Sequence, residues 1–309
     1  MATLLDLKDR IKTVTNIKKV TRAMQLVAAA KFNRAQLRAK DSRPYTRELS
    51  NILGVLSALS EGMPEDAKAA RSVEIAFDPD SEPLWTSWQR LTEPGEGQKP
   101  GLVLITSDRG LCGAFNTRLI RAAQEFLARH KDKSCQLITI GRKGRTFFKS
   151  KNYPILYSRE GLSDRLVLGE IREVTQNLVR LFTEDEVDSL HLIYTRFKSA
   201  MSSTVAEEQF LSIPPVEAAD TTGTDLYIME PDRMAVFNRL FPLYATTRIF
   251  SALAESFASE YGARMTAMQL ATNNAEEMLN ALIIQRNRLR QAIITKELAE
   301  IVGGAEALK

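Results

Sequence analysis

The strongest constraint on this sequence is the scarcity of helix-breaking residues near its two ends. No glycine precedes Gly54 and no proline precedes Pro44. The segment Tyr244–Val302 holds no proline and one glycine, Gly262. Glycine and proline are the residues that most disfavour a helix interior. The sequence therefore predicts one helix from about Thr3 to about Leu59, with a bend or break at Pro44, and another over Tyr244–Val302.

Apolar residues in both end segments recur mostly at steps of three and four, which is coiled-coil spacing. At 1.5 Å per residue, each segment would form a helix ~85 Å long, which a compact domain of this size does not need. We therefore expect the two helices to pair antiparallel, or nearly so, as one rod. The predicted contact faces are Leu4, Leu7, Ile11, Val14, Ile17, Val20, Met24 and Val27 at one end, and Met268, Ala271, Ala275, Met278, Leu282, Leu289 and Ala292 at the other.

Between the two ends, short apolar runs alternate with amphipathic segments. The order strand, helix, strand, helix, helix, strand predicts an α/β sandwich with a largely parallel, Rossmann-like sheet. The predicted strands are Gly101–Ser107, Cys135–Ile140 and Leu190–Phe197, with later candidates at Glu207–Ile213 and Leu226–Met229. The predicted helices are Ala114–His130, Lys143–Lys151 and Ser163–Phe182.

The predicted fold class is α/β, with a long antiparallel coiled coil of N- and C-terminal helices plus a central Rossmann-like domain. Residues 78–100 contain four prolines and two glycines, which predicts a surface insertion that Trp85 and Trp88 would fasten to the body. The expected segments are a long N-terminal helix at 1–60, a linker with the insertion at 61–100, the α/β domain at 101–230 and a long C-terminal helix at 231–309.

Charge is unevenly distributed along the chain. Residues 1–50 hold twelve lysines and arginines but four acidic residues, whereas the whole chain has a net charge of +4. A basic end on a mildly acidic body indicates a partner with acidic surfaces. No apolar run approaches the ~20 residues of a membrane-spanning helix. The first residues lack the layout of a secretory signal, so we expect a mature cytosolic chain.

The most enzyme-like element is the run SDRGLCG at Ser107–Gly113, which follows an apolar strand and opens a helix. Phosphate-binding loops occupy such positions. However, this run matches neither G-x-G-x-x-G nor the P-loop pattern, and it has no lysine for the terminal phosphates. We interpret it as a tight structural turn. The cluster Gly141–Arg145 opens the next helix and could hold an anion, although a solvated helix start is the favoured interpretation.

His130 and His191 stand alone in the sequence, without carboxylates or cysteines at the spacing of a metal site or a catalytic triad. Cys112 and Cys135 cannot form a disulfide framework or a zinc site by themselves. We interpret them as small buried thiols in a reducing compartment. The sequence therefore predicts no catalytic residue, no cofactor and no metal.

Two other classes of protein remain open at this point. A nucleotide-binding α/β enzyme with coiled-coil arms would use the Ser107–Gly113 loop. A nucleic-acid-binding coiled-coil protein would use the basic N-terminal helix, where only Phe32 and Tyr45 could stack on bases. Tight nucleotide binding by the chain alone would favour the first class. Affinity for DNA that falls steeply with salt would favour the second.

Three parts of the chain resemble the gamma subunits of F-type ATP synthases. Ile17–Phe32, IKKVTRAMQLVAAAKF, is similar to the N-terminal signature of that family, and Ser107–Asn116 is similar to its central fingerprint. The matches cover both ends and the middle of the chain in the expected order. The family's C-terminal signature is matched at Arg264, Met265, Ala267, Met268, Ala271, Thr272, Asn273, Asn274, Ala275, Arg290, Gln291, Ile294, Thr295, Glu297, Leu298, Glu300 and Ile301.

The resemblance implies a central rotor shaft without an active site, which couples proton translocation through a membrane ring to ATP synthesis or hydrolysis. The implied partners are a hexamer of alpha and beta subunits around the coiled coil, the epsilon subunit and the ring of c subunits, with no nucleic acid. By this resemblance Arg290, Gln291 and Thr295 engage a beta-subunit loop, and Met24 lies where the shaft passes an acidic lever of the beta subunits. The chain would be peripheral, at the cytoplasmic face of the bacterial inner membrane.

The chain departs from the chloroplast members of this family. Those members carry an insertion with two closely spaced cysteines that act as a light-linked thiol switch. Here Cys112 and Cys135 are 23 positions apart, and residues 78–100 contain no cysteine. No such regulation is therefore predicted.

Overall fold

The computed structural model describes residues 3–58, 72–78, 82–92, 97–162, 165–200, 202–213 and 230–306. Its contacts divide the chain into two compact units. One is formed by the two chain ends, Met1–Ala30 and Arg264–Lys309, and is called the two-helix unit below. The other is Lys31–Ala263 and is called the α/β unit.

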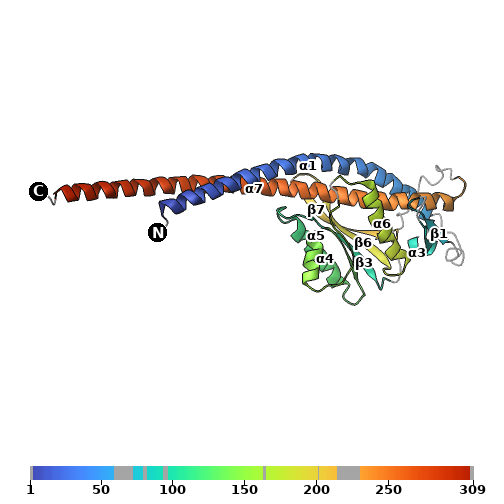
Figure 1. The fold of residues 1–309 in the computed structure, drawn as a ribbon. Helices are drawn as coiled ribbons and strands as arrows, with labels where there is room; N and C mark the ends of the chain where they lie inside the picture. The colour runs from blue at the N-terminus through green and yellow to red at the C-terminus, as the bar shows by residue number, and fades with distance from the viewer. Residues whose placement is uncertain are drawn as a thin grey trace. The chain divides into compact units, whose positions relative to one another are not determined.

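The first long helix, α1, covers Leu4–Ala58, close to its predicted bounds (Figure 1). It begins where Thr3 and Asp6 each donate a backbone N–H to the other's side-chain oxygen, at 2.9 and 3.2 Å. This reciprocal arrangement caps the helix. Of the bend or break predicted at Pro44, the break does not occur, because α1 continues through this residue. Pro44 and Lys40, one turn earlier, are both exposed, so water can satisfy the carbonyl that proline leaves without a helical N–H.

The second long helix, α7, covers Arg233–Glu306 and so begins before the proline-free segment Tyr244–Val302. The Asp232 carboxylate accepts hydrogen bonds from the backbone N–H groups two and three residues further on, at 2.8 and 3.0 Å, and this caps the helix. Pro242 lies inside α7. Phe237 and Phe241 of these first turns are fully buried. Their packing outweighs the hydrogen bond lost at the proline, which the sequence pattern alone does not register.

A five-stranded sheet forms the centre of the α/β unit, in the order β5-β4-β3-β6-β7. The first four of these strands run parallel, and β7 pairs antiparallel with β6. The predicted α/β class with a largely parallel sheet is confirmed. The strands are β3 Pro100–Ile105, β4 Gln136–Ile140, β5 Ile155–Arg159, β6 Ser189–Phe197 and β7 Ser203–Leu211, and the helices between them are α4 Phe115–Arg129, α5 Arg142–Ser150 and α6 Leu168–Thr183.

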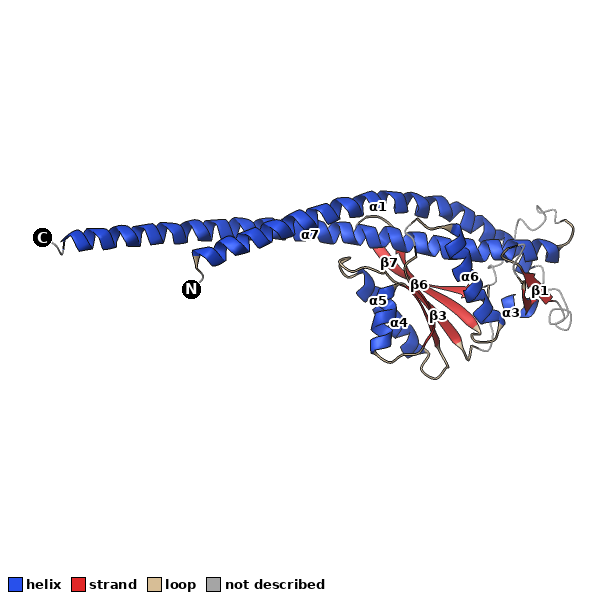
Figure 2. Ribbon diagram, in the orientation of Figure 1, coloured by secondary structure: helices blue, strands red, loops and turns tan. Residues whose placement is uncertain are grey.

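Both faces of this sheet are covered (Figure 2). Alternate residues of β3 point to opposite faces. Leu102 and Leu104 lie in a core with α4 and α5. Val103 and Ile105 lie in a second core with α6 and with the parts of α1 and α7 that belong to this unit. Because helices cover both faces, all six residues of β3 are buried, as expected for a central parallel strand.

Two elements that the sequence did not predict lie within residues 78–100. Strand β2, Leu84–Ser87, pairs antiparallel with β1, Ser72–Ile75, and helix α3, Trp88–Thr92, follows directly. Both strands are only four residues long, which is too short for a clear alternation of polar and apolar residues.

The two tryptophans of this region differ in their surroundings. Trp88 is buried, with its ring centroid 4.4 Å from that of Phe237 on α7. Trp85 is 56% exposed. Of the two tryptophans, Trp88 therefore fastens this region to the core.

Strand β5 was also not predicted. The candidate at Glu207–Ile213 is part of β7, which begins earlier, at Ser203. The candidate at Leu226–Met229 lies outside the described residues.

Candidate functional site

The two long helices contact each other in antiparallel order within the two-helix unit. Lys18 Nζ lies 2.8 Å from Glu276 Oε1, and Thr272 Oγ1 donates to Thr21 Oγ1 at 2.9 Å. The side-chain amide of Gln25 donates to that of Gln269. Moving forward along α1 therefore means moving backward along α7. The predicted antiparallel pairing is confirmed in this unit.

The contact face of α1 in this unit is narrower than the predicted one. Leu7, Val14 and Ala28 are buried at intervals of seven and fourteen residues, which is a heptad repeat. Ile17, Val20 and Val27, which were predicted to lie in the same seam, are about half exposed. A helix that packs against one partner helix buries a single stripe of side chains. The predicted apolar residues follow at irregular steps of three and four, so some of them fall outside this stripe. On α7, the buried residues of this unit are Arg264, Met268, Thr272 and Ala275.

The C-terminal part of α7 extends beyond the start of α1 (Figure 1). Because both helices rise equally per residue, the step from Lys18 back to Leu4 matches the step from Glu276 forward to Arg290. The residues after Arg290 therefore have no α1 residue beside them. Every residue from Gln291 to Val302 is exposed. We call the segment 291–302 the α7 tip.

The α7 tip carries apolar residues that sequence reasoning did not select as a site. Ile294, Leu298 and Ile301 follow one another at steps of four and three, on one helix face, and they are 47, 58 and 68% exposed. The same spacing could have identified them in the sequence. The sequence alone did not identify them as a site, because an apolar stripe on a long helix is normally assigned to the contact with the other helix.

The structure brings together three of the four predicted site residues. Arg290, Gln291 and Thr295 are exposed at the start of the α7 tip, where Thr295 Oγ1 donates to the Gln291 carbonyl at 2.9 Å. Met24 is half-buried on α1. Its neighbour Gln25 contacts Gln269, so Met24 lies far along the helix pair from the other three.

The Ser107–Gly113 loop is a structural turn. The Ser107 hydroxyl donates to the Arg109 carbonyl at 2.6 Å. The two carboxylate oxygens of Asp108 accept backbone N–H groups from Arg142 and Gly161, at 2.9 and 3.0 Å. The carboxylate thus holds three loops together at the carboxyl ends of β3, β4 and β5.

The start of α5 does not offer a free anion site. Its first three backbone N–H groups donate to the Asp108 carboxylate, the Ser107 carbonyl and Thr106 Oγ1, at 2.9, 3.0 and 2.9 Å. Gly141 has a φ of +98°, and an added Cβ would lie 2.1 Å from the Thr106 carbonyl oxygen. Close packing of two loops therefore explains this glycine. Protein groups therefore satisfy these backbone donors, while the side chains of Arg142, Lys143 and Arg145 are exposed to solvent.

The histidines lie near each other but do not form a metal site. The ring centroids of His130 and His191 are 4.3 and 5.2 Å from that of Phe126. Burial lowers the pKa of His191 below its ordinary value. Among the described residues, no group of three or more metal-binding side chains is present. The structure therefore gives the histidines a packing role around an aromatic ring.

The two thiols differ in burial. Cys112, which belongs to the Ser107–Gly113 loop, is buried, whereas Cys135 is half-buried. Burial raises the pKa of the Cys135 thiol to about 11, so it is not a thiolate near neutral pH.

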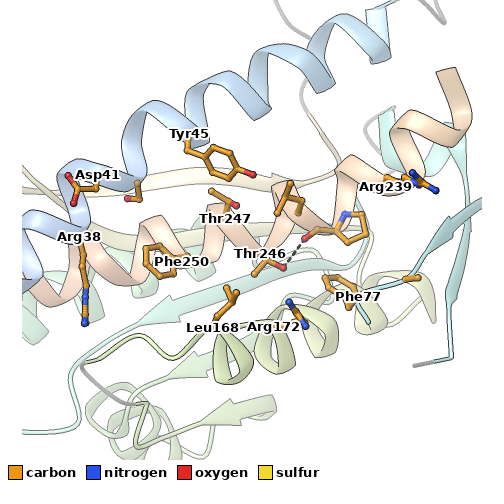
Figure 3. Close-up of a pocket in the computed structure, with 14 residues that line it drawn as sticks. Arg38, Asp41, Tyr45, Phe77, Leu168, Arg172, Arg239, Thr246, Thr247 and Phe250 are labelled. Carbon is orange, nitrogen blue, oxygen red and sulfur yellow. Dashed lines mark hydrogen bonds between the residues drawn. The ribbon is translucent and has the colours of Figure 1, made fainter. Parts of the chain in front are cut away.

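The α/β unit also contains a pocket of about 670 Å³ (Figure 3). Its walls come from α1, α6, α7 and the chain after β1. Arg38 and Arg239 lie at opposite ends of it, and Arg172 forms an ion pair with Asp78. The charged groups therefore do not converge on one point, as they do in sites that bind a polar ligand.

The fold and the α7 tip define a class of protein. It is an α/β domain that bears two long antiparallel helices, one of which ends in an exposed single-helix segment with an apolar face. None of the described helices is long and apolar enough to cross a membrane.

Comparison with known proteins identifies the family. A family model described as ATP synthase matches residues 3–308. The ATP synthase gamma chain of Moorella thermoacetica is 40% identical over 309 residues, with full coverage of both chains. That of Chloroherpeton thalassium is 38% identical and covers 100% of this chain and 99% of its own. The chain belongs to the ATP synthase gamma chain family, whose members are subunits of the ATP synthase complex.

Solved structures share the fold at low sequence identity. A chain of the Euglena gracilis mitochondrial ATP synthase, in a structure of OSCP, F1 and c-ring, matches with a TM-score of 0.63 at 16% identity. The match covers 99% of this chain and 94% of that chain. A chain of the Tetrahymena thermophila mitochondrial ATP synthase central stalk and c-ring matches with a TM-score of 0.55 at 22% identity, over 82% of this chain and 99% of that chain.

Proposed function

We propose that this chain is the central rotor shaft of an F-type ATP synthase. In this role it couples proton translocation through the membrane ring to ATP synthesis or hydrolysis at the alpha/beta hexamer. Membership of the gamma chain family supports the proposal. The structural observation that carries it is the α7 tip, because a single helix with an apolar face needs a surrounding protein surface.

The occupant that fits the tip is a collar of alpha and beta subunits. Ile294, Leu298 and Ile301 would lie against apolar side chains of the collar. A beta-subunit loop would bond to Arg290, just before the tip, and to Gln291 and Thr295 within it. Met24 would face an acidic element of the beta subunits, to which the basic N-terminal half of α1 is electrostatically complementary.

The other partners and the location follow from the same proposal. The α/β unit would contact the epsilon subunit and the c-subunit ring, and the complex would hold the chain peripherally at the cytoplasmic face of the inner membrane. The chain would contribute no catalytic residue and no cofactor. The division into segments 1–60, 61–100, 101–230 and 231–309 stays a prediction.

The test is reconstitution of the complex into vesicles with and without this chain. With the chain present, we expect ATP hydrolysis to drive proton uptake. Without it, we expect any hydrolysis that remains to drive none. ATP turnover by the purified chain alone, well above background and abolished by Asp108→Ala, would instead favour the nucleotide-binding enzyme.

A paired variant tests the role of the tip. Ile294→Ser with Leu298→Ser removes apolar surface that is already exposed, so the isolated chain should melt at the parent temperature. In the complex, proton pumping should fall. Leu168→Ser, at a leucine of similar exposure in the α/β unit, is the matched control. Equal pumping by both variants would show that the apolar face of the tip is not a working contact.

A further inference from the structure

Strand β6 extends beyond the end of its neighbour β3. The two strands pair from Pro100 to Leu104 on β3 and from Ser189 to Ile193 on β6, but β6 continues to Phe197. On its other side, β6 pairs with β7 along this whole extension. Towards β3, backbone groups of the extension have no strand partner, although Thr195 and Phe197 are buried. A buried backbone group without a hydrogen bond is costly.

Helix α7 supplies the missing partners with side chains from little more than one turn. Ser256 Oγ accepts the Thr195 N–H at 3.4 Å, and Ser259 Oγ donates to the Thr195 carbonyl at 3.4 Å. Glu255 Oε2 accepts the Phe197 N–H at 3.0 Å. The helix thus takes the place of a strand at the end of the sheet.

Helix α1 joins the same point. Arg43 Nε donates to Glu255 Oε1 at 2.9 Å, and another Arg43 nitrogen donates to the Phe197 carbonyl. The backbone of Phe197 is therefore held by α7 through its N–H and by α1 through its carbonyl. We call Arg43, Glu255, Ser256 and Ser259, with the two β6 residues that they bond, the Glu255 clasp.

The α7 residues of the clasp are buried, whereas the Arg43 side chain is 44% exposed. Glu255, Ser256 and Ser259 are 6, 2 and 4% exposed. Hydrogen bonds to a charged group are about twice as strong as neutral ones. Removing one partner of a buried charge leaves the other without compensation. By contrast, the apolar contacts between sheet and helices are non-directional.

Among the described residues, a second polar link joins α7 to the sheet. Arg248 lies 3.0 Å from Glu208 of β7, and the side chains of this pair are 22 and 19% exposed. Arg196 and Tyr194 also bond to Glu208. Unlike the clasp, this link includes no residue of α1.

We propose that the Glu255 clasp carries torque between the two long helices and the five-stranded sheet with its helices α4, α5 and α6. This sheet and these three helices are called the α/β domain here. Glu255 is a positioning residue, because it fixes the end of β6 to α7 and α1, so that turning the domain turns the helices. This inference rests on the proposed rotor function. It predicts that weakening the clasp makes the rotor torsionally softer and less well coupled, while assembled complexes continue to hydrolyse ATP.

The first measurement is mechanical. A bead is attached to the α/β domain through Lys133→Cys in a Cys135→Ser background, and its angular fluctuations are recorded on surface-held complexes without ATP. Angular variance rises as torsional stiffness falls. We expect Glu255→Ala to increase the variance and Glu255→Gln, which keeps an acceptor for the Phe197 N–H, to increase it less. Only assembled complexes are observed, so a mere loss of folded protein would not change this readout.

The second measurement is coupling. We expect the proton gradient sustained per ATP hydrolysed to fall in vesicles with Glu255→Ala and to be partly restored with Glu255→Gln. Arg129→Ala is the matched control, because the Arg129–Glu207 pair joins α4 to β7 and includes no residue of the long helices. This control should match the parent in both measurements.

The outcomes separate this inference from the proposed function. If the parent complex itself pumps no protons, the rotor function fails. If the parent pumps while Glu255→Ala leaves both variance and coupling unchanged, the clasp is overturned. If Glu255→Ala does not assemble, the Ser256→Ala, Ser259→Ala double variant removes two of the three bonds from α7 to β6 without leaving a charge unpaired. Unchanged variance in that variant would equally overturn the proposal.

Discussion

The α/β unit and the two-helix unit bury their residues to very different extents. In the α/β unit all six residues of β3 are buried, and α7 is buried at every position from Ser251 to Ser256. In the two-helix unit, α1 buries only Leu7, Val14 and Ala28 among its described residues, and the α7 tip buries nothing. Apolar surface removed from water is the main source of stability. The α/β unit therefore has its stabilising contacts within the chain, whereas the two-helix unit leaves much of its apolar surface exposed.

This difference decides what a substitution can do in each unit. Changes in the apolar cores of the α/β unit should act on folding, and changes on the outer faces of the two-helix unit should act on assembly and coupling. The predictions below run from the largest expected effect on stability to the smallest.

Phe241→Ala should produce the largest loss of stability. Phe241 is fully buried on α7 and stacks on Phe237 with ring centroids 5.7 Å apart. Its truncation removes apolar contacts and leaves a cavity, which costs ~3–5 kcal/mol. Urea unfolding of the chain measures this. A loss no larger than that of Leu7→Ala would break the contrast between the two units.

Leu7→Ala should cost less. Leu7 is 1% exposed, but its neighbours Leu5, Asp6 and Lys8 are exposed. Water can enter the space that the leucine leaves, so we expect the lower end of the range for leucine truncation, ~2 kcal/mol. Helical circular dichroism during urea unfolding follows this loss. Leu5→Ala, at a leucine that is 67% exposed, is the control and should leave the unfolding curve at the parent position.

The pH dependence of stability should include a contribution from His191. Burial lowers its pKa in the folded chain below the unfolded value near 6.5. Below that pH, the unfolded state binds a proton that the folded state does not. The contribution of His191 to stability is therefore present above about pH 6.5 and is lost as the pH falls through the lowered pKa.

Urea unfolding of the parent and of His191→Gln across this pH range tests the sign. The parent should lose more stability than the variant as the pH falls. Glu207 faces the ring with a charge that opposes the shift, whereas His130 and Arg129 reinforce it. Parallel curves for the two proteins would mean that His191 titrates alike in the folded and unfolded states.

The units also differ in how far the sequence predicted them. The central sheet was predictable because β3, β4 and β6 are apolar runs bounded by turns. A short run such as Gly101–Ser107 fits a buried strand better than a helix. The proline-free pattern did not predict that α7 continues through Pro242, because that pattern does not register the buried phenylalanines beside the proline. The Glu255 clasp was also unpredictable. It depends on where β6 ends relative to β3, which is a property of tertiary structure.

In the two-helix unit, the periodicity predicted the helices but not which apolar residues meet. Val20 and Val27 fit the predicted seam as well as Val14 does, yet only Val14 is buried. Which apolar residues of α1 are buried depends on the position of the facing helix α7. The sequence of α1 alone does not specify that position. The positions of Met24, Arg290, Gln291 and Thr295 on the helices could be predicted. Their contacts with other subunits stay a prediction.

Met24→Lys should have the smallest effect on stability and a large effect on coupling. Met24 is half-buried on α1, and nearby Lys19 and Arg22 are exposed. A lysine at this position can extend its ammonium group to the surface of the helix pair, so little folding free energy is lost. In the complex, the added charge would bond to a passing acidic surface of a beta subunit. Tighter binding in one rotary position slows passage to the next.

Vesicles that contain the variant complex allow this to be tested against folding. Proton pumping should fall, while ATP hydrolysis and the melting temperature of the chain stay near the parent values. Met24→Gln is the matched control, because it adds polarity at the same site without a charge and should pump like the parent. If pumping, hydrolysis and melting temperature fall together in Met24→Lys, Met24 is a packing residue. The outer face of the two-helix unit would then depend on internal packing as the α/β unit does, and the contrast between the units would fail at this position.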